Sequence, residues 1–266
     1  MSRLRIAIVG CTGRMGQTLV RLATVDPALE LVAGVTVDDD PRLGDDVGSL
    51  AGLDELGLAV TTNIPVECDA VIEFSSPAGC MTWAAWCAAR GIPLVSGTTG
   101  LADIHLAELR TAAQRIPILW APNMSTGINL LLALVQDLAT KLDENWDIEI
   151  VETHHRRKVD APSGTAKALL EAAAAGRQRR VTDVAVYGRG AETGPRSAGQ
   201  IGVHALRMGS IVGEHEVHFT SEAESLTLTH RAFSRETFAA GALRAAQWIV
   251  TRPPGLYAMR DVLFAQ

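Results

Sequence analysis

The chain has 266 residues, of which 47% are hydrophobic and 20% charged, and its formal net charge at pH 7 is −6. This length allows one large domain or two of ordinary size, and it can bury a large core without disulfides or structural metals. The composition excludes wholesale disorder and collagen-like sequence, and the acidic balance argues against a general nucleic-acid binder. The longest apolar run, 128–135, is too short for a membrane span, and the N-terminus has no signal-peptide core, so a cytoplasmic protein is expected.

The four cysteines, Cys11, Cys68, Cys80 and Cys87, show no Cys-x-x-Cys spacing. This spacing indicates ordinary reduced thiols rather than a zinc site or a disulfide framework. We therefore expect no metal in the site.

The first half of the chain alternates short β-branched runs with stretches rich in Ala and Leu. This alternation predicts a parallel sheet with helices on both faces. The strand runs are continuously apolar, which is typical of strands buried on both sides. The expected strands are 5–9, 30–35, 70–74, 93–95 and 117–120, and the expected helices are 13–23, 76–90 and 101–113.

The pattern changes near Pro122. Strand-like runs then follow one another with few helices between them, which predicts an α+β second domain with an open, mainly antiparallel sheet. One face of such a sheet can face water or pair with another subunit. The expected helices are 127–141, 166–175 and 235–250, the last capped by Ser234, and the expected strands are 148–152, 181–187, 202–207, 211–220 and 225–230.

A loop over 188–199 contains four glycines and one proline. Such a composition predicts a mobile segment. It could close over a ligand or be a disordered surface excursion, and the sequence leaves both open.

The first strand leads into Gly10-x-x-Gly13-x-x-Gly16 at the start of a helix. Gly10 allows a sharp turn, and Gly16 allows the helix to pack closely on the sheet. Gly13 allows the backbone to approach a pyrophosphate, whose charge is met by N–H groups at the helix N-terminus. The pattern therefore predicts dinucleotide binding, the alternative being a glycine turn that serves packing only.

The end of the second strand leaves the choice of cofactor open. Rossmann sites usually have an acid there to hold the adenosine ribose. Here Thr36 is nearest to that position, and the aspartates at 38–40 come slightly late. A threonine can bond a ribose hydroxyl but does not repel a 2′-phosphate, and Arg42 and Arg14 are the only arginines nearby in sequence. Either NADH or NADPH is therefore possible.

Two more loops, 97–100 and 121–124, follow strands of the same predicted sheet. Open α/β sheets bind ligands beyond the carboxyl ends of their strands. The small hydroxyl residues and exposed backbone of these loops suit a nicotinamide amide and its ribose.

The run from Glu152 to Thr165 has the most informative chemistry. Five consecutive residues, His154 to Lys158, can be cationic, and adjacent histidines can pass protons near neutral pH. Ser163 and Thr165 open a helix whose N–H groups and hydroxyls form an anion pocket. The combination predicts a site for a small carboxylate-bearing substrate, the alternative being a nucleotide-phosphate or subunit-interface patch.

Together these motifs carry a family resemblance. They are Gly10-x-x-Gly13-Arg-Met-Gly16, Gly97-Thr-Thr-Gly100, Asn123-Met-Ser-Thr-Gly127-Ile-Asn129 and Glu152-x-His-His-Arg-x-Lys158-Val-Asp-Ala-Pro-Ser-Gly-Thr165, and matching segments continue over 207–215, 229–235 and 255–263. The chain resembles the 4-hydroxy-tetrahydrodipicolinate reductase (dihydrodipicolinate reductase) family of lysine and diaminopimelate biosynthesis over nearly its whole length.

The resemblance implies an α/β protein with two domains. One is a Rossmann-like parallel-sheet nucleotide domain, 1–124, completed by 235–266. The other, 125–234, is an α+β substrate and tetramerisation domain with an open mixed sheet. It further implies an oxidoreductase that uses NADH or NADPH to convert 4-hydroxy-tetrahydrodipicolinate to tetrahydrodipicolinate with loss of water, and that acts as a homotetramer without nucleic acid or membrane.

Residue roles follow from the same resemblance. It implies that His154 donates and accepts the proton, that Lys158 is a second proton donor, and that His155, Gly164 and Thr165 contact the substrate. The implied cofactor residues are Gly10, Cys11, Thr12, Gly13, Arg14, Met15, Gly97, Thr98, Thr99, Ala121, Pro122, Asn123 and Met124. Thr12, Thr36 and Ser76 depart from common family residues and bear on cofactor preference.

Two other readings stay open from the residues alone. A dehydrogenase of the aldehyde type would need a cysteine nucleophile near the nicotinamide, and no cysteine follows a suitable strand end. A nucleotide-binding sensor would bind the cofactor without consuming it. Arg235 is a candidate for a carboxylate contact. We expect the remaining histidines to be structural or superficial; they are His105, His204, His215, His218 and His230.

Overall fold

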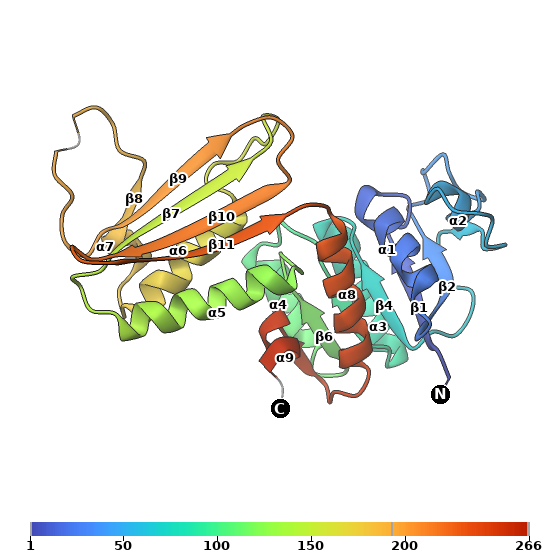
Figure 1. The fold of residues 1–266 in the computed structure, drawn as a ribbon. Coiled ribbons are helices and arrows are strands. Elements are labelled where there is room, and N and C mark those ends of the chain that lie inside the picture. The colour runs from blue at the N-terminus through green and yellow to red at the C-terminus, as the bar shows by residue number, and fades with distance from the viewer. Residues whose placement is uncertain (1, 193, 265–266) are drawn as a thin grey trace. The chain divides into compact units, whose positions relative to one another are not determined.

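The computed structural model describes residues 2–192 and 194–264 (Figure 1). They form two compact units, one ending at Thr126 and resuming at Arg235, the other spanning Gly127–Ser234. Met1, Thr193 of the glycine-rich loop, and residues 265–266 of the expected C-terminal segment lie outside the described residues. Within the described ranges, every helix is too short or too polar to cross a membrane.

The first unit is built on a seven-stranded sheet in the order β12-β6-β5-β4-β1-β2-β3. All its neighbouring strands run parallel. The strands are β1 Leu4–Val9, β2 Leu29–Val35, β3 Val60–Thr61, β4 Ala70–Glu73, β5 Leu94–Ser96, β6 Pro117–Trp120 and β12 Gly255–Tyr257. The helices are α1 Arg14–Val25, α2 Val47–Leu50, α3 Pro77–Arg90, α4 Asp103–Ala112, α8 Glu236–Ile249 and α9 Met259–Phe264.

Both faces of this sheet are buried, as the continuous apolar runs predict. On β1, Ile6 and Ile8 pack into the core shared with α1 and α8. The alternate residues Ala7 and Val9 pack into the core shared with α3 and α4. Because successive side chains of a strand point to opposite faces, a strand between two helical layers needs an apolar residue at every position.

Two predictions about local structure in this unit need correction. Ser234 was expected to cap the last helix, but α8 begins at Glu236 with Arg235 at the capping position. Arg235 already has helical backbone angles, φ −72° and ψ −10°, so the observed start of the helix differs from the expected one by a single residue. The short β3 and β12 were not expected, because edge strands of two or three residues carry too little periodicity to be detected.

The glycine turn after β1 has the geometry that its sequence predicts. Gly10 has φ +79°, and a Cβ there would lie 2.2 Å from the carbonyl oxygen of Phe74. A Cβ at Gly16 would lie 2.1 Å from the carbonyl oxygen of Gly10. A side chain at either position would therefore force α1 away from the sheet.

The second unit has a five-stranded sheet in the order β11-β10-β7-β9-β8. Its strands are β7 Asp147–His154, β8 Ala185–Tyr187, β9 Ile201–Arg207, β10 Gly213–Thr220 and β11 Ser225–Ala232. Its helices are α5 Thr126–Lys141, α6 Gly164–Gly176 and α7 Val181–Val184. The helices α5 and α6 lie along one face of the sheet (Figure 1).

This sheet is mixed, which confirms the mixed sheet implied by the family resemblance; it is less antiparallel than the strand pattern alone predicts. β10 pairs antiparallel with β7 and β11, whereas β9 pairs parallel with β7 and β8. The chain passes through α6 between β7 and β8, and it passes through a long loop between β8 and β9. Each of these connections is long enough to return the chain in the same direction. The expected strand 181–187 is also half helix, because its first four residues form α7, with Val184 buried in the core.

Candidate active site

The first unit contains a pocket of about 500 Å³ beyond the carboxyl ends of its central strands. Residues from the loops after β1, β4, β5 and β6 and from the start of α8 line it. They are Gly13, Arg14, Met15, Phe74, Ser75, Gly97, Thr98, Thr99, Pro122, Asn123, Met124, Arg235 and Phe238. Nine of the thirteen expected cofactor residues are in this set. The other four, Gly10, Cys11, Thr12 and Ala121, are not part of the lining, and all except Gly10 are buried.

The start of α1 fits a phosphate group. The first N–H groups of a helix have no partner inside the helix, and they attract anions. The capping residue of α1 is Gly13, which is exposed and offers no side-chain oxygen to these groups. This end of the pocket therefore suits the pyrophosphate of a dinucleotide.

Glu73 holds two of the pocket loops in place. It is fully buried at the end of β4, and its carboxyl group accepts hydrogen bonds from the backbone N–H and hydroxyl of Ser75 and from the hydroxyls of Ser96 and Thr98. The N–H of Ser75 also donates to Thr98 Oγ1. One carboxyl group thus fixes the loops after β4 and β5 relative to each other.

Asp40 supplies an acid at the end of β2, although it stands four residues beyond Thr36, the residue nearest to the usual position of the ribose-binding acid. Its carboxylate accepts from the hydroxyls of Thr12 and Thr36 at 2.6 and 2.7 Å. Arg42 Nε and Nη2 donate to it at 2.7 and 2.9 Å, and Nη1 donates to the carbonyl of Thr12. These bonds, first those of Arg42, hold the pKa of Asp40 well below its usual value. The loop after β2 folds back, so an acid four residues beyond Thr36 reaches the strand end.

The second unit places His154 in a network of buried polar groups at the end of β7. His154 Nδ1 lies 2.5 Å from Oε2 of Glu152, which is fully buried. Arg207, at the end of β9, donates from Nη1 and Nη2 to the two oxygens of Glu152 at 2.8 and 2.7 Å. Burial lowers the pKa of His154, and the carboxylate of Glu152 opposes that shift. His154 is therefore a buried, titratable group whose ring is held by a carboxylate partner.

The other expected substrate residues are near His154 in the chain. Lys158 pairs with Asp160 at 2.8 Å, and its charge adds to the lowering of the His154 pKa. His155 is half-buried, Gly164 is exposed and Thr165 is half-buried in the first turn of α6. Ser163 caps α6 by accepting from the N–H of Ala166, and its own N–H donates to Glu152 at 3.0 Å. The cationic run and the α6 N-terminus are thus joined through Glu152.

Two histidines expected to be structural or superficial, His215 and His230, lie in the same cluster as His154. The ring of His215 on β10 lies 5.2 Å from that of His154, edge to face, and 6.4 Å from that of His230 on β11. Burial lowers the pKa of His215 to about 3, so it stays neutral beside His154. Only strand pairing could have shown this, because His215 lies directly opposite Glu152 in the register of β10 with β7. Arg235, a candidate for a carboxylate contact, lines the pocket of the first unit.

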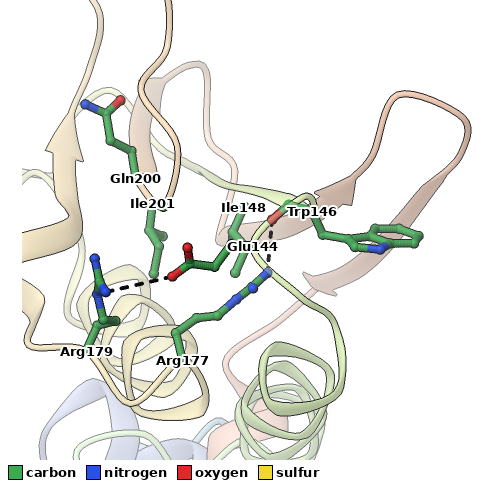
Figure 2. A pocket seen from close by; sticks show the side chains of 8 residues that line it. Glu144, Trp146, Ile148, Arg177, Arg179, Gln200 and Ile201 are labelled. Atoms are coloured by element: carbon green, nitrogen blue, oxygen red, sulfur yellow. Dashed lines mark hydrogen bonds and ion pairs between the residues drawn. The ribbon is translucent and has the colours of Figure 1, made fainter.

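A smaller depression in the second unit lies at the other end of β7 (Figure 2). Arg177, just after α6, donates to the carbonyl of Trp146 at 3.0 Å, and Arg179 lies 3.8 Å from Glu144. These contacts tie the end of α6 to the turn before β7. We assign the depression a structural role, because its arginines already have partners within the chain.

The cysteines do not supply a nucleophile. All four are free and buried. Burial raises the pKa of each thiol, to about 11 for Cys11 and Cys68 and about 12 for Cys80. A thiol that stays protonated is a poor nucleophile, which weighs against the aldehyde-dehydrogenase alternative.

Comparisons with known proteins cover nearly the whole chain. Residues 4–124 match the family model described as dihydrodipicolinate reductase, N-terminus, and residues 127–263 match dihydrodipicolinate reductase, C-terminus. The 4-hydroxy-tetrahydrodipicolinate reductase of Rubrobacter xylanophilus is 46% identical over 98% of both chains. That of Parvibaculum lavamentivorans is 48% identical over 98% of this chain and 97% of its own. Dipicolinate-bound dihydrodipicolinate reductase from Paenisporosarcina sp. TG-14 has the same fold, with a TM-score of 0.77, 24% identity and coverage of 97% and 98%.

Proposed function

The chain belongs to the dihydrodipicolinate reductase family, an oxidoreductase family of lysine and diaminopimelate biosynthesis, and from this premise we propose how its residues divide the reaction. The substrate is 4-hydroxy-tetrahydrodipicolinate. It gains a hydride and a proton and loses water, giving tetrahydrodipicolinate and the oxidised nicotinamide cofactor. The observation that carries the proposal is the buried Glu152–His154 pair joined to the N-terminus of α6 and close in sequence to Lys158.

The first unit holds the cofactor. When bound, a reduced nicotinamide dinucleotide supplies the hydride. The first turn of α1 would bind its pyrophosphate, and the loops fastened by Glu73 would line the space for the nicotinamide end. The chain's contribution here is orientation, since two loops locked to each other cannot drift during hydride transfer.

The second unit holds the substrate and moves the proton. The N–H groups of Gly164 and Thr165 in the first turn of α6 would bind one carboxylate. His154 would deliver from Nε2 the proton that balances the hydride, and Lys158 would stabilise the negative charge that develops on the substrate. His155 would make a further polar contact.

We further propose that the chain accepts NADPH as well as NADH. Asp40 would repel a 2′-phosphate if it were a free acid at the ribose. Its charge is instead balanced by Arg42, and both its oxygens already accept hydrogen bonds from the chain. The half-exposed guanidinium of Arg42 would favour a phosphate nearby.

We also propose that the second unit assembles a homotetramer in the cytoplasm. The face of its sheet opposite α5 and α6 presents Val151, His204 and Leu206 among charged residues. A sheet face uncovered by helices of its own chain can pair with another copy. The mass of the particle in solution, measured by light scattering at several concentrations, tests this directly.

Loss of absorbance at the nicotinamide band, with substrate generated enzymatically in the same cuvette, tests the reaction. The proposal predicts turnover with both NADH and NADPH. Cofactor binding without turnover, for any cyclic dicarboxylate, would identify a sensor rather than a reductase. Separate titrations of each cofactor by fluorescence give the preference independently of turnover.

A further inference from the structure

Glu152 makes more contacts than the proposed function requires of it. Its Oε1 accepts from Arg207 Nη2 at 2.7 Å and from the N–H of Ser163 at 3.0 Å. Its Oε2 accepts from Arg207 Nη1 at 2.8 Å and lies 2.5 Å from His154 Nδ1. The side chain is fully buried, so these partners replace water completely. One carboxylate thus connects the proton donor, the α6 N-terminus and an arginine with no role assigned above.

The contact with Glu152 determines which nitrogen of His154 carries hydrogen. An ionised carboxylate offers only acceptors, so Nδ1 must donate to it. The nitrogen left to exchange a proton is then Nε2. Burial would raise the pKa of Glu152, but the bonds from Arg207, His154 and Ser163 outweigh it and hold the pKa below its usual value. The carboxylate is therefore ionised throughout the working pH range.

Arg207 limits how strongly Glu152 holds a proton on His154. A buried carboxylate facing the imidazole alone would favour the imidazolium form strongly. Arg207 takes one bond on each oxygen and adds its own positive charge near the ring. The other groups around the ring are Lys158 with its partner Asp160, and neutral His215, which lies against His230. The net effect of burial and of these charged groups is a lowered pKa of His154, so its imidazolium form can give up a proton.

Arg207 also fastens the cationic loop. Its Nη2 donates to the carbonyl of Asp160 at 2.7 Å, and the carboxylate of Asp160 pairs with Lys158. The N–H of Met208 donates to the carbonyl of His154 at 2.8 Å. The end of β9 therefore controls both the charge at His154 and the path of the loop that carries Lys158.

We infer that Glu152 and Arg207 are positioning residues that act through His154. Glu152 fixes the imidazole in the Nδ1–H tautomer and favours its protonated form, and Arg207 offsets that pull so that the proton can leave. This inference rests on the proposed role of His154 as proton donor.

The opposite face of β7 supplies a matched control. Glu149 also accepts from a histidine, His204, at 2.6 Å, and from two arginines, Arg189 and Arg196. It lies three residues from Glu152, so the two side chains point to opposite faces of the sheet. A change of Glu149 alters the same kind of cluster in the same strand without touching His154.

The test is a titration of His154 in the full chain by long-range ¹H–¹⁵N NMR, with its signals assigned by their loss in His154→Gln. In the unmodified protein we expect the Nδ1–H tautomer. Glu152→Gln should lower the pKa of His154 further, by at least one unit, a tenfold change in its acid dissociation constant. Arg207→Gln should raise the pKa above that of an ordinary histidine. Glu149→Gln should leave the titration of His154 unchanged.

The pKa of His154 also distinguishes a variant that has lost structure from one that has lost only a charge. A loosened site would let water in and bring the pKa of His154 back toward its ordinary value in every variant. If Glu152→Gln does not fold, the double variant Glu152→Gln/Arg207→Met removes both charges at once, and it should still show the lowered pKa. Unchanged tautomer and pKa in these variants would overturn the inference.

Activity separates this inference from the proposed function. If His154 is the donor, the pH profile of kcat should move with its measured pKa, down in Glu152→Gln and up in Arg207→Gln. His154→Gln could turn over normally while Glu152→Gln and Arg207→Gln still show the expected changes in the pKa of His154. In that case Glu152 and Arg207 do position His154, but His154 is not the proton donor.

Discussion

Each unit of the molecule contains a completely buried carboxyl group, Glu73 in the first and Glu152 in the second, and the two groups have different partners. Glu73, in the first unit, is bonded by the hydroxyls of Ser75, Ser96 and Thr98 and by one N–H. Glu152, in the second unit, is bonded by Arg207, a titratable imidazole and one N–H. Both stand at or near the carboxyl end of a strand.

The difference fits the tasks that we propose for the two units. Hydroxyl and N–H donors do not change charge, so the donors of the Glu73 network hold two loops in one geometry without a titratable partner. Cationic and titratable donors make the Glu152 network respond to the state of His154. Binding a dinucleotide needs fixed loops, whereas reduction needs a group that gains and loses a proton. Asp40 is intermediate, because it is bonded by two threonines and by Arg42.

The largest expected effect is on kcat, and it comes from replacing His154, the titratable partner of Glu152. His154→Gln should lower kcat by roughly 10²–10⁴-fold, the usual range for loss of a general acid. Cofactor affinity should stay the same, because the pocket of the first unit contains no residue of this network. Steady-state kinetics and cofactor fluorescence measure the two quantities. Near-normal turnover would show that the contrast between the two carboxyl groups has no catalytic meaning.

Glu73→Gln tests the rigid member of the pair. Its amide would bring N–H groups against hydroxyls that now donate, so bonds are lost in a buried site, at a cost of about 1–3 kcal/mol in the free energy of unfolding. The loops should loosen, and the Kd for NADH should rise by roughly tenfold, which corresponds to about 1.4 kcal/mol. The pH profile of kcat should not move. Glu67→Gln, at an exposed position of the same unit, is the control.

A third prediction concerns His215, whose ring stays neutral beside the Glu152 network. It states how this buried neutral ring changes the stability of the fold with pH. Its pKa is about 3 in the fold against an ordinary 6.5, so between these values the unfolded chain binds a proton that the folded chain does not. The free energy of unfolding should therefore fall as pH falls below 6.5, by about 1.4 kcal/mol per pH unit for this one group. His215→Phe should flatten that slope in urea unfolding, and His218→Phe, on the opposite face of β10, controls for the loss of a histidine. An equal slope in both variants would contradict the assignment.

Arg42→Ala tests the intermediate case and should have the smallest effect. Without the guanidinium, Asp40 faces the proposed ribose site with an uncompensated charge. The Kd for NADPH should rise a few-fold relative to that for NADH, in keeping with a partly exposed charge contact of about 1 kcal/mol. Separate titrations with each cofactor measure the ratio. An unchanged ratio would place the 2′ position away from Asp40 and Arg42.

Much of the parallel-sheet unit could be predicted from the residues. Gly10 and Gly16 are required by contacts of 2.2 and 2.1 Å that any side chain would violate, and such requirements leave a local signature. The loops after β5 and β6 follow strands directly, so their place at one sheet edge follows from parallel pairing. The mixed second sheet could not be predicted in the same way, because a strand pattern does not tell which strands lie beside each other.

The sequence by itself determined what depends on neighbours along the chain: the glycine turn, the alternation of strands and helices, and the histidine–lysine run with its helix start. Only the tertiary structure decided that Arg207 and His215, more than fifty residues beyond Glu152, surround it, and that Asp40 returns to Thr36. The physical reason is that hydrogen bonds and ion pairs act over a few ångströms in space, and sequence separation carries no information about that distance once the chain crosses between strands.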